Sequence, residues 1–284
     1  MKTAVEVVKE GIEYLAGSGL SEPELNSQWL LASVLGLKRL EIIAGPDLPV
    51  EKSRISVYRK LLKQRAGNVP LSYVTGFHDF MGIELEVCPG VFIPRPETEE
   101  LVEKILQFIG KKSVRILDFG TGSGCIAVAL ASALFSCKIT AVDSSAKALA
   151  VAKKNALKHN LSKKMIFLKA GSVKDVPGTF HLIVSNPPYI PVCVIKGLDA
   201  EVRAEPRKAI DGGKDGLKWI KRIVMEAPLK LRPAGALFME IGADQKQKIE
   251  PLFSGKPWRK VEFIKDYNNR YRFVKGQVTA VVSE

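Results

Sequence analysis

The stretch VRILDFGTGSGCIAVALASAL, residues 114–134, decides the fold of this 284-residue chain. It begins with an apolar run typical of a buried strand and ends with a longer apolar run of good helix formers. Between the two runs stand Gly120, Gly122 and Gly124, which allow a tight turn and a close approach of the backbone to a ligand. We therefore predict a strand, a glycine turn and a helix, with a ligand site at the turn.

The alternation of strand and helix continues toward the C-terminus. The predicted elements are the strands KITAVD (138–143), KMIFLKA (164–170), FHLIVS (180–185) and GALFMEIG (235–242), and the helices AKALAVAKKNALKHN (146–160) and GLKWIKRIVMEAPLKL (216–231). The last stretch, RYRFVKGQVTAVVS (270–283), is compatible with a final pair of strands. Such alternation predicts a parallel sheet covered by helices on both faces, with ligands bound at the carboxyl ends of its strands.

The first 75 residues follow a different pattern. Apolar residues recur there at helical spacing, which predicts a small helical bundle for binding or scaffolding. Ser21 followed by Glu24 is typical of a capping box, with Ser21 as the N-cap residue. The stretch FHDFMGIELEVCPGVFIP, which follows this region, alternates in polarity and contains two glycines, so we predict a hairpin connector at 76–93.

The glycine turn fits two kinds of nucleotide site. Residues 122–127 match the G-x-G-x-x-A form of a dinucleotide site, so an NAD-dependent dehydrogenase is one alternative. Asp118 argues against it, because a carboxylate at the strand end would repel a pyrophosphate, and no catalytic His or Tyr–Lys pair accompanies the glycines. A cationic nucleoside without phosphate suits this arrangement better. S-adenosylmethionine is such a ligand, and we place Asp118 with the three glycines in its site.

Two further positions fall at the same predicted edge of the sheet. Asp143 ends the second strand, where a carboxylate can accept hydrogen bonds from both ribose hydroxyls. The alternative is that Asp143 caps the following helix. After the third strand, Gly171, Ser172 and Val173 offer an adenine ring only backbone or apolar contacts. We include Ser172 in the cofactor site on this basis.

The stretch SNPPYI, residues 185–190, follows the fourth strand. Two adjacent prolines cannot continue a strand, so this loop is rigid. The side-chain oxygen of Asn186 and the carbonyl oxygen of Pro187 can accept hydrogen bonds from a substrate nitrogen and direct its lone pair at a methyl group. Tyr189 can stack on or enclose a flat group. We predict Asn186, Pro187 and Tyr189 as catalytic residues, with Pro188 also in contact with substrate and Asn186 also beside the cofactor.

These residues resemble the amino-methyltransferase group of S-adenosylmethionine-dependent enzymes, whose mark is [Asn/Asp/Ser]-Pro-Pro-[Tyr/Phe/Trp]. Two other stretches, FIPRPETEELVE (92–103) and EPRKAIDGGKDGL (205–217), narrow the choice. Together with LDFGTGSGCIAVALA, they closely resemble the release-factor glutamine N5-methyltransferases, over essentially the whole chain. The resemblance implies an α/β fold: a Rossmann-like catalytic domain, 94–284, joined through the hairpin connector to an N-terminal helical bundle, 1–75.

The resemblance also implies an activity. The methyl acceptor is the glutamine of the Gly-Gly-Gln loop of peptide-chain release factors, the cofactor is S-adenosylmethionine and its product is S-adenosylhomocysteine. The implied cofactor contacts are Gly120, Thr121, Gly122, Ser123, Gly124 and Asp143, and the implied contacts with the substrate amide are Asn186, Pro187 and Tyr189. The chain departs from the family at residues 171–173, where the family often has an acidic residue and an aromatic one.

Two alternatives remain open at the level of the sequence. The first is a nucleic-acid amino-methyltransferase that acts on adenine N6 or guanine N2. It would use the same Asn-Pro-Pro-Tyr residues, 186–189, with Tyr189 stacked on a flipped base. The formal charge of +13 favours it, whereas the RPETEE stretch and the lack of an inserted target-recognition region oppose it. The other alternative is a binding module that keeps the fold without activity, which the presence of both Asn186 and Asp143 opposes.

Composition limits the remaining possibilities. The four cysteines contain no C-x-x-C pair and the three histidines are scattered, so we expect no metal site and no structural disulfide. The N-terminus is amphipathic and no apolar run is long enough for a bilayer, so we expect a cytoplasmic protein without a membrane partner. We also expect a monomer that holds no stable nucleic acid. Release factors are commonly acidic, so the basic charge is expected to steer one toward the enzyme.

Overall fold

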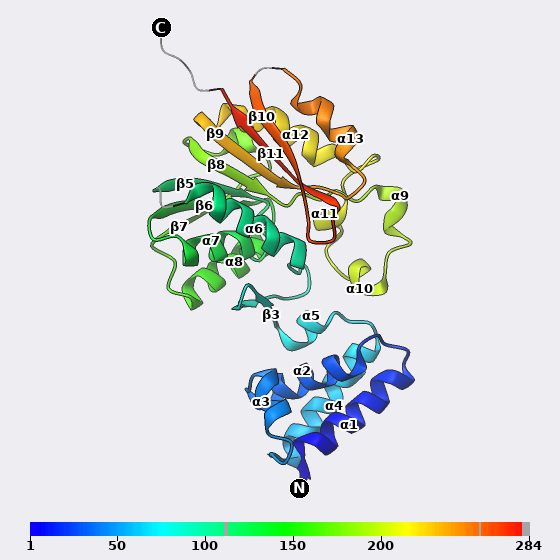
Figure 1. The fold of residues 1–284 in the computed structure, drawn as a ribbon. Coiled ribbons are helices and arrows are strands. Elements are labelled where there is room, and N and C mark those ends of the chain that lie inside the picture. Colours follow the sequence, from blue (N-terminus) through cyan, green and yellow to red (C-terminus); the bar gives the residue numbers. More distant parts are fainter. Residues whose placement is uncertain (111–112, 256, 280–284) are drawn as a thin grey trace. The chain divides into compact units, whose positions relative to one another are not determined.

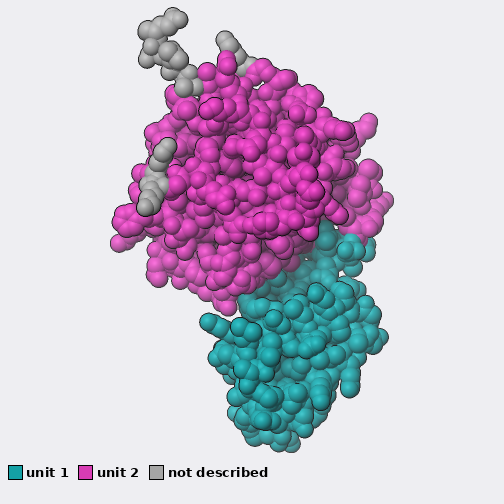
Figure 2. All heavy atoms as spheres, in the orientation of Figure 1, with its two compact units in different colours: residues 1–77, 199–204 teal, residues 78–198, 205–284 magenta. Residues whose placement is uncertain are grey.

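A computed structural model describes residues 1–110, 113–255 and 257–279, which form two compact units (Figure 2). The first unit comprises residues 1–77 and 199–204, and the second comprises 78–198 and 205–284. None of the helices among the described residues is both long and apolar enough to cross a membrane.

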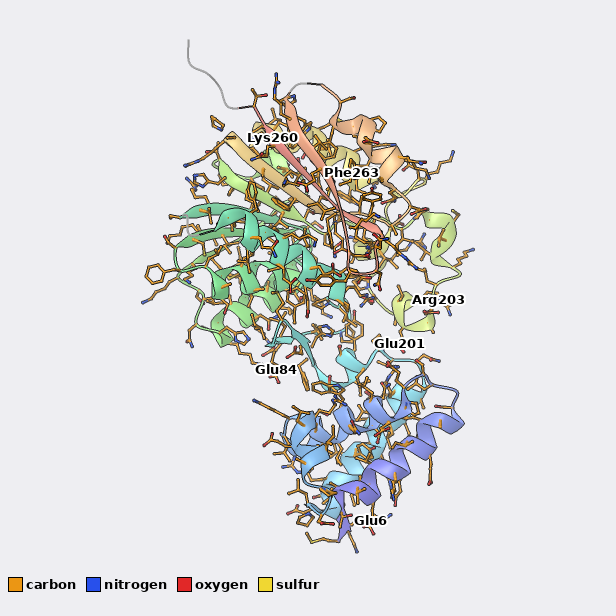
Figure 3. All side chains as sticks on the ribbon, viewed as in Figure 1. Glu6, Glu84, Glu201, Arg203, Lys260 and Phe263 are labelled. Carbon is orange, nitrogen blue, oxygen red and sulfur yellow. The ribbon has the colours of Figure 1, made fainter. Side chains whose placement is uncertain are left out.

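The first unit is a helical bundle with one short pair of strands. Its apolar side chains, among them Leu15, Leu30 and Tyr58, form a core of their own. A capping box of Thr3 and Glu6 starts the first helix (Figure 3). The elements are β1 Lys2–Thr3, α1 Ala4–Gly17, α2 Pro23–Leu35, α3 Arg39–Ala44, β2 Pro49–Val50, α4 Lys52–Ala66, α5 Leu71–Thr75 and, from the later segment, α10 Ala200–Arg203.

The start of α2 differs from the sequence prediction. Glu22 is the N-cap residue, with a φ of +52° and no side-chain capping bond, so the assignment of Ser21 as N-cap is wrong. The proline at position 23 explains the difference, because the residue before a proline is disfavoured in the helical region. The Nδ2 of Asn26 donates to the carbonyl oxygens of Ser21 and Glu22 at 3.2 and 2.8 Å, which ties the preceding turn to the helix without accepting from its first N–H groups.

The second unit contains a hairpin, β3 Phe77–Phe80 and β4 Ile83–Glu86, and a seven-stranded sheet with its helices. The hairpin is tied to α8, where Lys158 donates to Glu84 at 2.6 Å (Figure 3). The remaining elements are α6 Pro96–Ile109, β5 Val114–Phe119, α7 Cys125–Ala133, β6 Cys137–Asp143, α8 Ala146–Lys158, β7 Met165–Lys169, β8 Phe180–Ser185, α9 Val192–Ile195, α11 Arg207–Ile210, α12 Lys218–Glu226, β9 Leu231–Glu240, α13 Lys246–Ile249, β10 Trp258–Lys265 and β11 Tyr271–Val278.

The strand order is β10-β11-β9-β8-β5-β6-β7, and strands β5 to β9 pair in parallel. Successive side chains of β5 face opposite layers: Ile116 packs in the core cluster of α6 and α7, and Leu117 in that of α12 and α13. Figure 1 shows α6 to α8 on one face of the sheet and α12 and α13 on the other. The predicted parallel sheet with helices on both faces is confirmed.

This topology fixes where a ligand can bind. The chain leaves β5 toward β6 and β7 on one side, then returns to β8 on the other side of β5. The loops after β5 and β8 therefore diverge at a topological switch point, where a crevice opens at the carboxyl edge of the sheet. The glycine turn follows β5, and the Asn186 loop follows β8.

The end of the chain was predicted incorrectly. Residues 271–278 form one strand, β11, and its antiparallel neighbour β10 comes from residues before it. The sequence WRKVEFIK of β10 carries four charged side chains, as suits a strand at the edge of a sheet, and this conceals the strand pattern. The predicted segment also covers residues 280–283, which lie outside the described residues.

Candidate active site

A cavity of about 350 Å³ opens at the switch point of the sheet. Its wall includes the loops after β5, β6 and β8, the start of α6, and parts of α11 and α12. The structure brings together here eight of the residues proposed from the sequence: Gly120, Thr121, Gly122, Ser123, Asp143, Asn186, Pro187 and Pro188. Phe92 and Trp219 add aromatic surface to the same wall.

The glycine turn is held mainly by backbone bonds. The N–H groups of Gly120 and Thr121 donate to the carbonyl oxygen of Val142 at 2.8 and 2.9 Å. Gly120 and Gly122 have φ values of +81° and +57°, in the left-handed region that favours glycine. A Cβ built at Gly122 meets no protein atom within 4 Å, so this glycine borders open space.

Asp143 joins the glycine turn to the start of α8. Its Oδ2 accepts from the N–H of Gly122 at 3.0 Å, and its Oδ1 accepts from the N–H of Ser145 at 2.8 Å. The N-cap of α8 is Ser145, not Asp143, so the capping alternative does not hold for this carboxylate. Asp143 is thus a half-buried carboxylate at the edge of the cavity, beside the turn.

Four residues proposed from the sequence lie outside the cavity wall: Asp118, Gly124, Ser172 and Tyr189. Asp118 is fully buried behind the turn, where its Oδ2 accepts from the Thr121 hydroxyl at 2.6 Å. Burial raises the pKa of Asp118 to about 7. Gly124 begins α7, and a Cβ there would lie 3.0 Å from the Cβ of Ala152.

Ser172 faces α12 rather than the cavity. Its hydroxyl donates to Oε2 of Glu226 at 2.6 Å, and the same oxygen accepts from the N–H of Val173 at 2.8 Å. An acidic side chain thus does reach the loop after β7, but it comes from α12 and binds the backbone. Trp219, on the same helix, lines the cavity.

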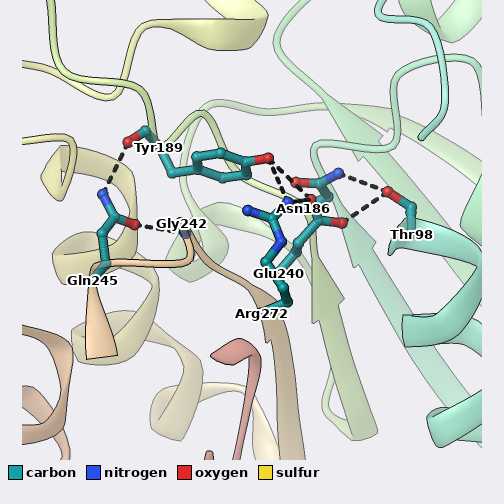
Figure 4. A network of polar contacts seen from close by, with 7 residues as sticks. All are labelled: Thr98, Asn186, Tyr189, Glu240, Gly242, Gln245 and Arg272. Atoms are coloured by element: carbon teal, nitrogen blue, oxygen red, sulfur yellow. Dashed lines mark hydrogen bonds and ion pairs between the residues drawn. The ribbon is translucent and has the colours of Figure 1, made fainter. Parts of the chain in front are cut away.

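Asn186 stands where β8 ends. Its Nδ2 donates to the Thr98 hydroxyl at 3.0 Å, and Thr98, at the start of α6, also lines the cavity (Figure 4). Among the described residues none donates to Oδ1 of Asn186, which therefore remains available as an acceptor. That this oxygen accepts a hydrogen bond from a substrate nitrogen stays a prediction.

A buried polar cluster lies behind Asn186; we use this name for Thr98, Asn186, Tyr189, Glu240 and Arg272 (Figure 4). Glu240, fully buried at the end of β9, accepts from the hydroxyls of Thr98 at 2.8 Å and Tyr189 at 3.2 Å. Nη2 of Arg272 pairs with Glu240 at 3.2 Å and donates to Tyr189 at 2.9 Å. Desolvation raises the pKa of Glu240, against the opposing effect of Arg272.

The position of Tyr189 follows from this cluster. Its hydroxyl is held between Glu240 and Arg272, and burial raises its pKa to about 12. The guanidinium of Arg272 lies 5.2 Å from the ring centroid. The hydroxyl of Tyr189 is thus bound within the cluster, and contact of its ring with a substrate stays a prediction.

The two stretches that narrowed the family, 92–103 and 205–217, meet in the structure. Arg95 forms an ion pair with Glu205, and Oε2 of Glu205 accepts from the N–H of Ile93 at 3.0 Å. Residues 206–209 then line the same cavity as the glycine turn. The stretch 92–103 also contains the first residue of α6, Pro96, and it therefore positions Thr98 in the first turn of that helix.

Sequence reasoning missed Thr98, Glu240, Arg272 and Trp219. Glu240 left a usable signal, because a single acidic residue stands at the end of an otherwise apolar strand run, LFME. A buried charge of that kind needs a partner. Arg272 and Thr98 carry no sequence signal that links them to the site, because they lie on elements far from position 186 in the chain.

Known proteins share both parts of this architecture. The PrmC N-terminal domain family model matches residues 6–76, and the Methyltransferase small domain model matches residues 88–193. A protein of Geobacter sulfurreducens named release factor glutamine methyltransferase is 39% identical over 268 residues, which are 93% of each chain. The chain belongs to the release factor glutamine methyltransferase family. The family predicted from the motifs is thereby confirmed, together with the methyltransferase class of the enzyme.

Solved structures agree with this family at the level of the fold. The hMettl16 catalytic domain, in complex with MAT2A 3′UTR hairpin 6, aligns with a TM-score of 0.57 at 17% identity, covering 83% of this chain and 84% of that one. A Thermus thermophilus 16S rRNA N2 G1207 methyltransferase, in complex with AdoMet and guanosine, aligns with a TM-score of 0.52 at 19% identity, covering 71% of this chain and 49% of that one. The Rossmann-like methyltransferase fold predicted from the sequence is confirmed.

Proposed function

We propose that this protein transfers a methyl group from S-adenosylmethionine to N5 of a glutamine side chain, in the Gly-Gly-Gln loop of peptide-chain release factors. One observation carries the chemical part of the proposal: Asn186, on the cavity wall, has its Nδ2 bound by Thr98 and its Oδ1 available. The protein substrate is supported by the family to which the chain belongs.

The residues of the cavity fit S-adenosylmethionine. The open space at Gly122 lets a ligand approach the turn, where a side chain would obstruct it. Asp143 is a carboxylate suited to ribose hydroxyls, and its present hydrogen bonds hold it beside the turn. Trp219 offers the aromatic surface for adenine that residues 171–173 lack. When bound, this cofactor supplies an electrophilic methyl group on a sulfonium.

The chain's own residues would act by positioning the acceptor. An amide nitrogen is a weak nucleophile, because its lone pair is delocalised into the carbonyl group. Its two hydrogens would be accepted by Oδ1 of Asn186 and by the carbonyl oxygen of Pro187, which returns electron density to nitrogen and aims the lone pair. Pro188 has a fixed φ, so it holds the Pro187 carbonyl in place. The proton released from nitrogen would pass to solvent.

A methyl-transfer assay with labelled S-adenosylmethionine tests this proposal. The acceptors are a purified release factor, the same factor with the loop Gln replaced by Ala, total RNA and total DNA. We expect label only on the unmodified factor. Label on RNA or DNA would overturn the proposal in favour of a nucleic-acid amino-methyltransferase. Equal label on both forms of the factor would place the methyl group on another residue.

A further inference from the structure

Thr98 occupies the middle of a directed chain of hydrogen bonds. Its hydroxyl oxygen accepts from Nδ2 of Asn186 at 3.0 Å, and its hydroxyl proton is donated to Oε2 of Glu240 at 2.8 Å. All three side chains lie in one unit of the molecule, and Thr98 is 1% exposed (Figure 4). The bond from Thr98 to Glu240 is therefore shielded from water, and the bond from Asn186 to Thr98 is partly buried.

The direction of these hydrogen bonds follows from the chemistry of Glu240, at which they end. The ion pair with Arg272 favours the ionised form of Glu240, which only accepts hydrogen bonds, and Glu240 also accepts from the Tyr189 hydroxyl. The single proton of Thr98 is thus committed to Glu240. The other function of the hydroxyl is to accept, and within the described part of the chain it accepts from the Nδ2 end of Asn186.

A side-chain amide has two ends of nearly equal size but opposite character. If Asn186 were turned over, its Oδ1 would face the Thr98 oxygen, which has no proton left to donate. Two acceptors would then stand in contact in a buried place, which is unfavourable. The hydrogen bonds through Thr98 to Glu240 therefore favour the orientation of the Asn186 amide in which Nδ2 faces Thr98.

We propose that Thr98, backed by Glu240, is a positioning residue for methyl transfer: it fixes the amide of Asn186 so that Oδ1, and not Nδ2, meets the substrate nitrogen. This inference rests on the role given to Asn186 in the proposed function. Thr98 acts through Asn186, and a turned amide would present a donor to a substrate group that is itself a donor.

The test compares Thr98→Val, which keeps the shape of the side chain without its hydroxyl, with Thr98→Ser, which keeps the hydroxyl. For Thr98→Val we expect kcat on a release factor to fall on the order of 10- to 100-fold, while KM and the dissociation constant of S-adenosylmethionine change less than about twofold. Thr98→Ser should recover most of the loss. A purely structural role would alter cofactor binding and thermal stability along with kcat.

A double-mutant cycle with Asn186→Ala supplies the decisive control. If Thr98 acts through Asn186, Thr98→Val should cause no further loss in the Asn186→Ala background. An equal loss in both backgrounds, or wild-type kcat in Thr98→Val, would overturn the inference. Full activity of Asn186→Ala alone would instead overturn the mechanism under the proposed function, so the two failures are distinguishable.

Glu240→Gln serves if Thr98→Val does not fold. A glutamine at 240 can donate to the Thr98 oxygen, which frees the hydroxyl proton for Oδ1 of Asn186 and removes the preference for one orientation. We expect kcat to fall with cofactor affinity retained, and Glu240→Gln to cause no further loss in the Asn186→Ala background. Wild-type kcat in Glu240→Gln would contradict the inference.

Discussion

Two loops at the same edge of the sheet are built in opposite ways. The glycine turn after β5 is shaped by its backbone: N–H groups bind Val142 and Asp143, and glycines take left-handed conformations. The loop after β8 is held by side chains that come from α6, β9 and β11. We infer from this difference that the two loops have separate roles: the glycine turn accommodates a cofactor, and the loop after β8 orients a reacting group.

The largest effect is expected on the Asn186 loop. Asn186→Ala removes one of the two acceptors proposed for the substrate nitrogen, so kcat should fall on the order of 100- to 1000-fold. The dissociation constant of S-adenosylmethionine should stay within about twofold, because the glycine turn is unchanged. Steady-state kinetics and calorimetry measure the two quantities. Asn186→Asp, which keeps an acceptor oxygen, should retain more activity than Asn186→Ala.

The opposite pattern is expected for the glycine turn. Gly122→Val places a branched side chain in the open space beside the turn and should weaken cofactor binding by about tenfold or more. The left-handed conformation adds a stability cost of about 1–3 kcal/mol. Gly82→Val is the matched control, because Gly82 also has a positive φ, +74°, and open space at its Cβ, but it lies outside the cavity wall. The control should lose stability and keep its affinity; equal losses of affinity would contradict the comparison.

Asp118, the buried acid behind the glycine turn, should make the stability of the protein depend on pH. Burial raises the pKa of Asp118 from 3.8 to about 7, so between these pH values the folded protein holds a proton that the unfolded chain has lost. The free energy of unfolding should therefore fall as pH rises through this window, by up to about 1.4 kcal/mol per pH unit from this group. Urea unfolding of the wild type and Asp118→Asn, from pH 4 to 7, measures the difference, and equal slopes would contradict it.

A smaller effect, on the free energy of unfolding, is expected from Gln245, which binds the Asn186 loop at Tyr189. Nε2 of Gln245 donates to the carbonyl oxygen of Tyr189 at 2.9 Å, and its Oε1 accepts from the N–H of Gly242 at 2.8 Å (Figure 4). Gln245→Leu leaves both backbone groups unpaired and should cost about 1–3 kcal/mol of unfolding free energy. Gln247→Leu, at an exposed position of α13, the short helix that Gln245 caps, should cost little. Similar losses in both variants would show that these bonds do not brace the loop.

The same contrast explains what the sequence could predict. The glycine turn and the Asn-Pro-Pro-Tyr loop carry their information locally, in residues next to one another, so both were placed at the correct strand ends. The buried polar cluster is not local: Asn186 and Thr98 are 88 residues apart, and Tyr189 and Arg272 are 83 apart. Only the folded sheet brings these side chains together, so the sequence does not predict that the Tyr189 hydroxyl binds Glu240 and Arg272.

A single-turnover experiment on the wild type, Asn186→Ala and Gly122→Val separates the roles of the two loops. Each protein is first given limiting labelled S-adenosylmethionine, the bound fraction is measured, and a release factor is then added. We predict that Asn186→Ala binds the label and fails to pass it on. Gly122→Val should bind little, yet transfer what it has bound. Rapid transfer by Asn186→Ala would contradict the separate roles of the two loops.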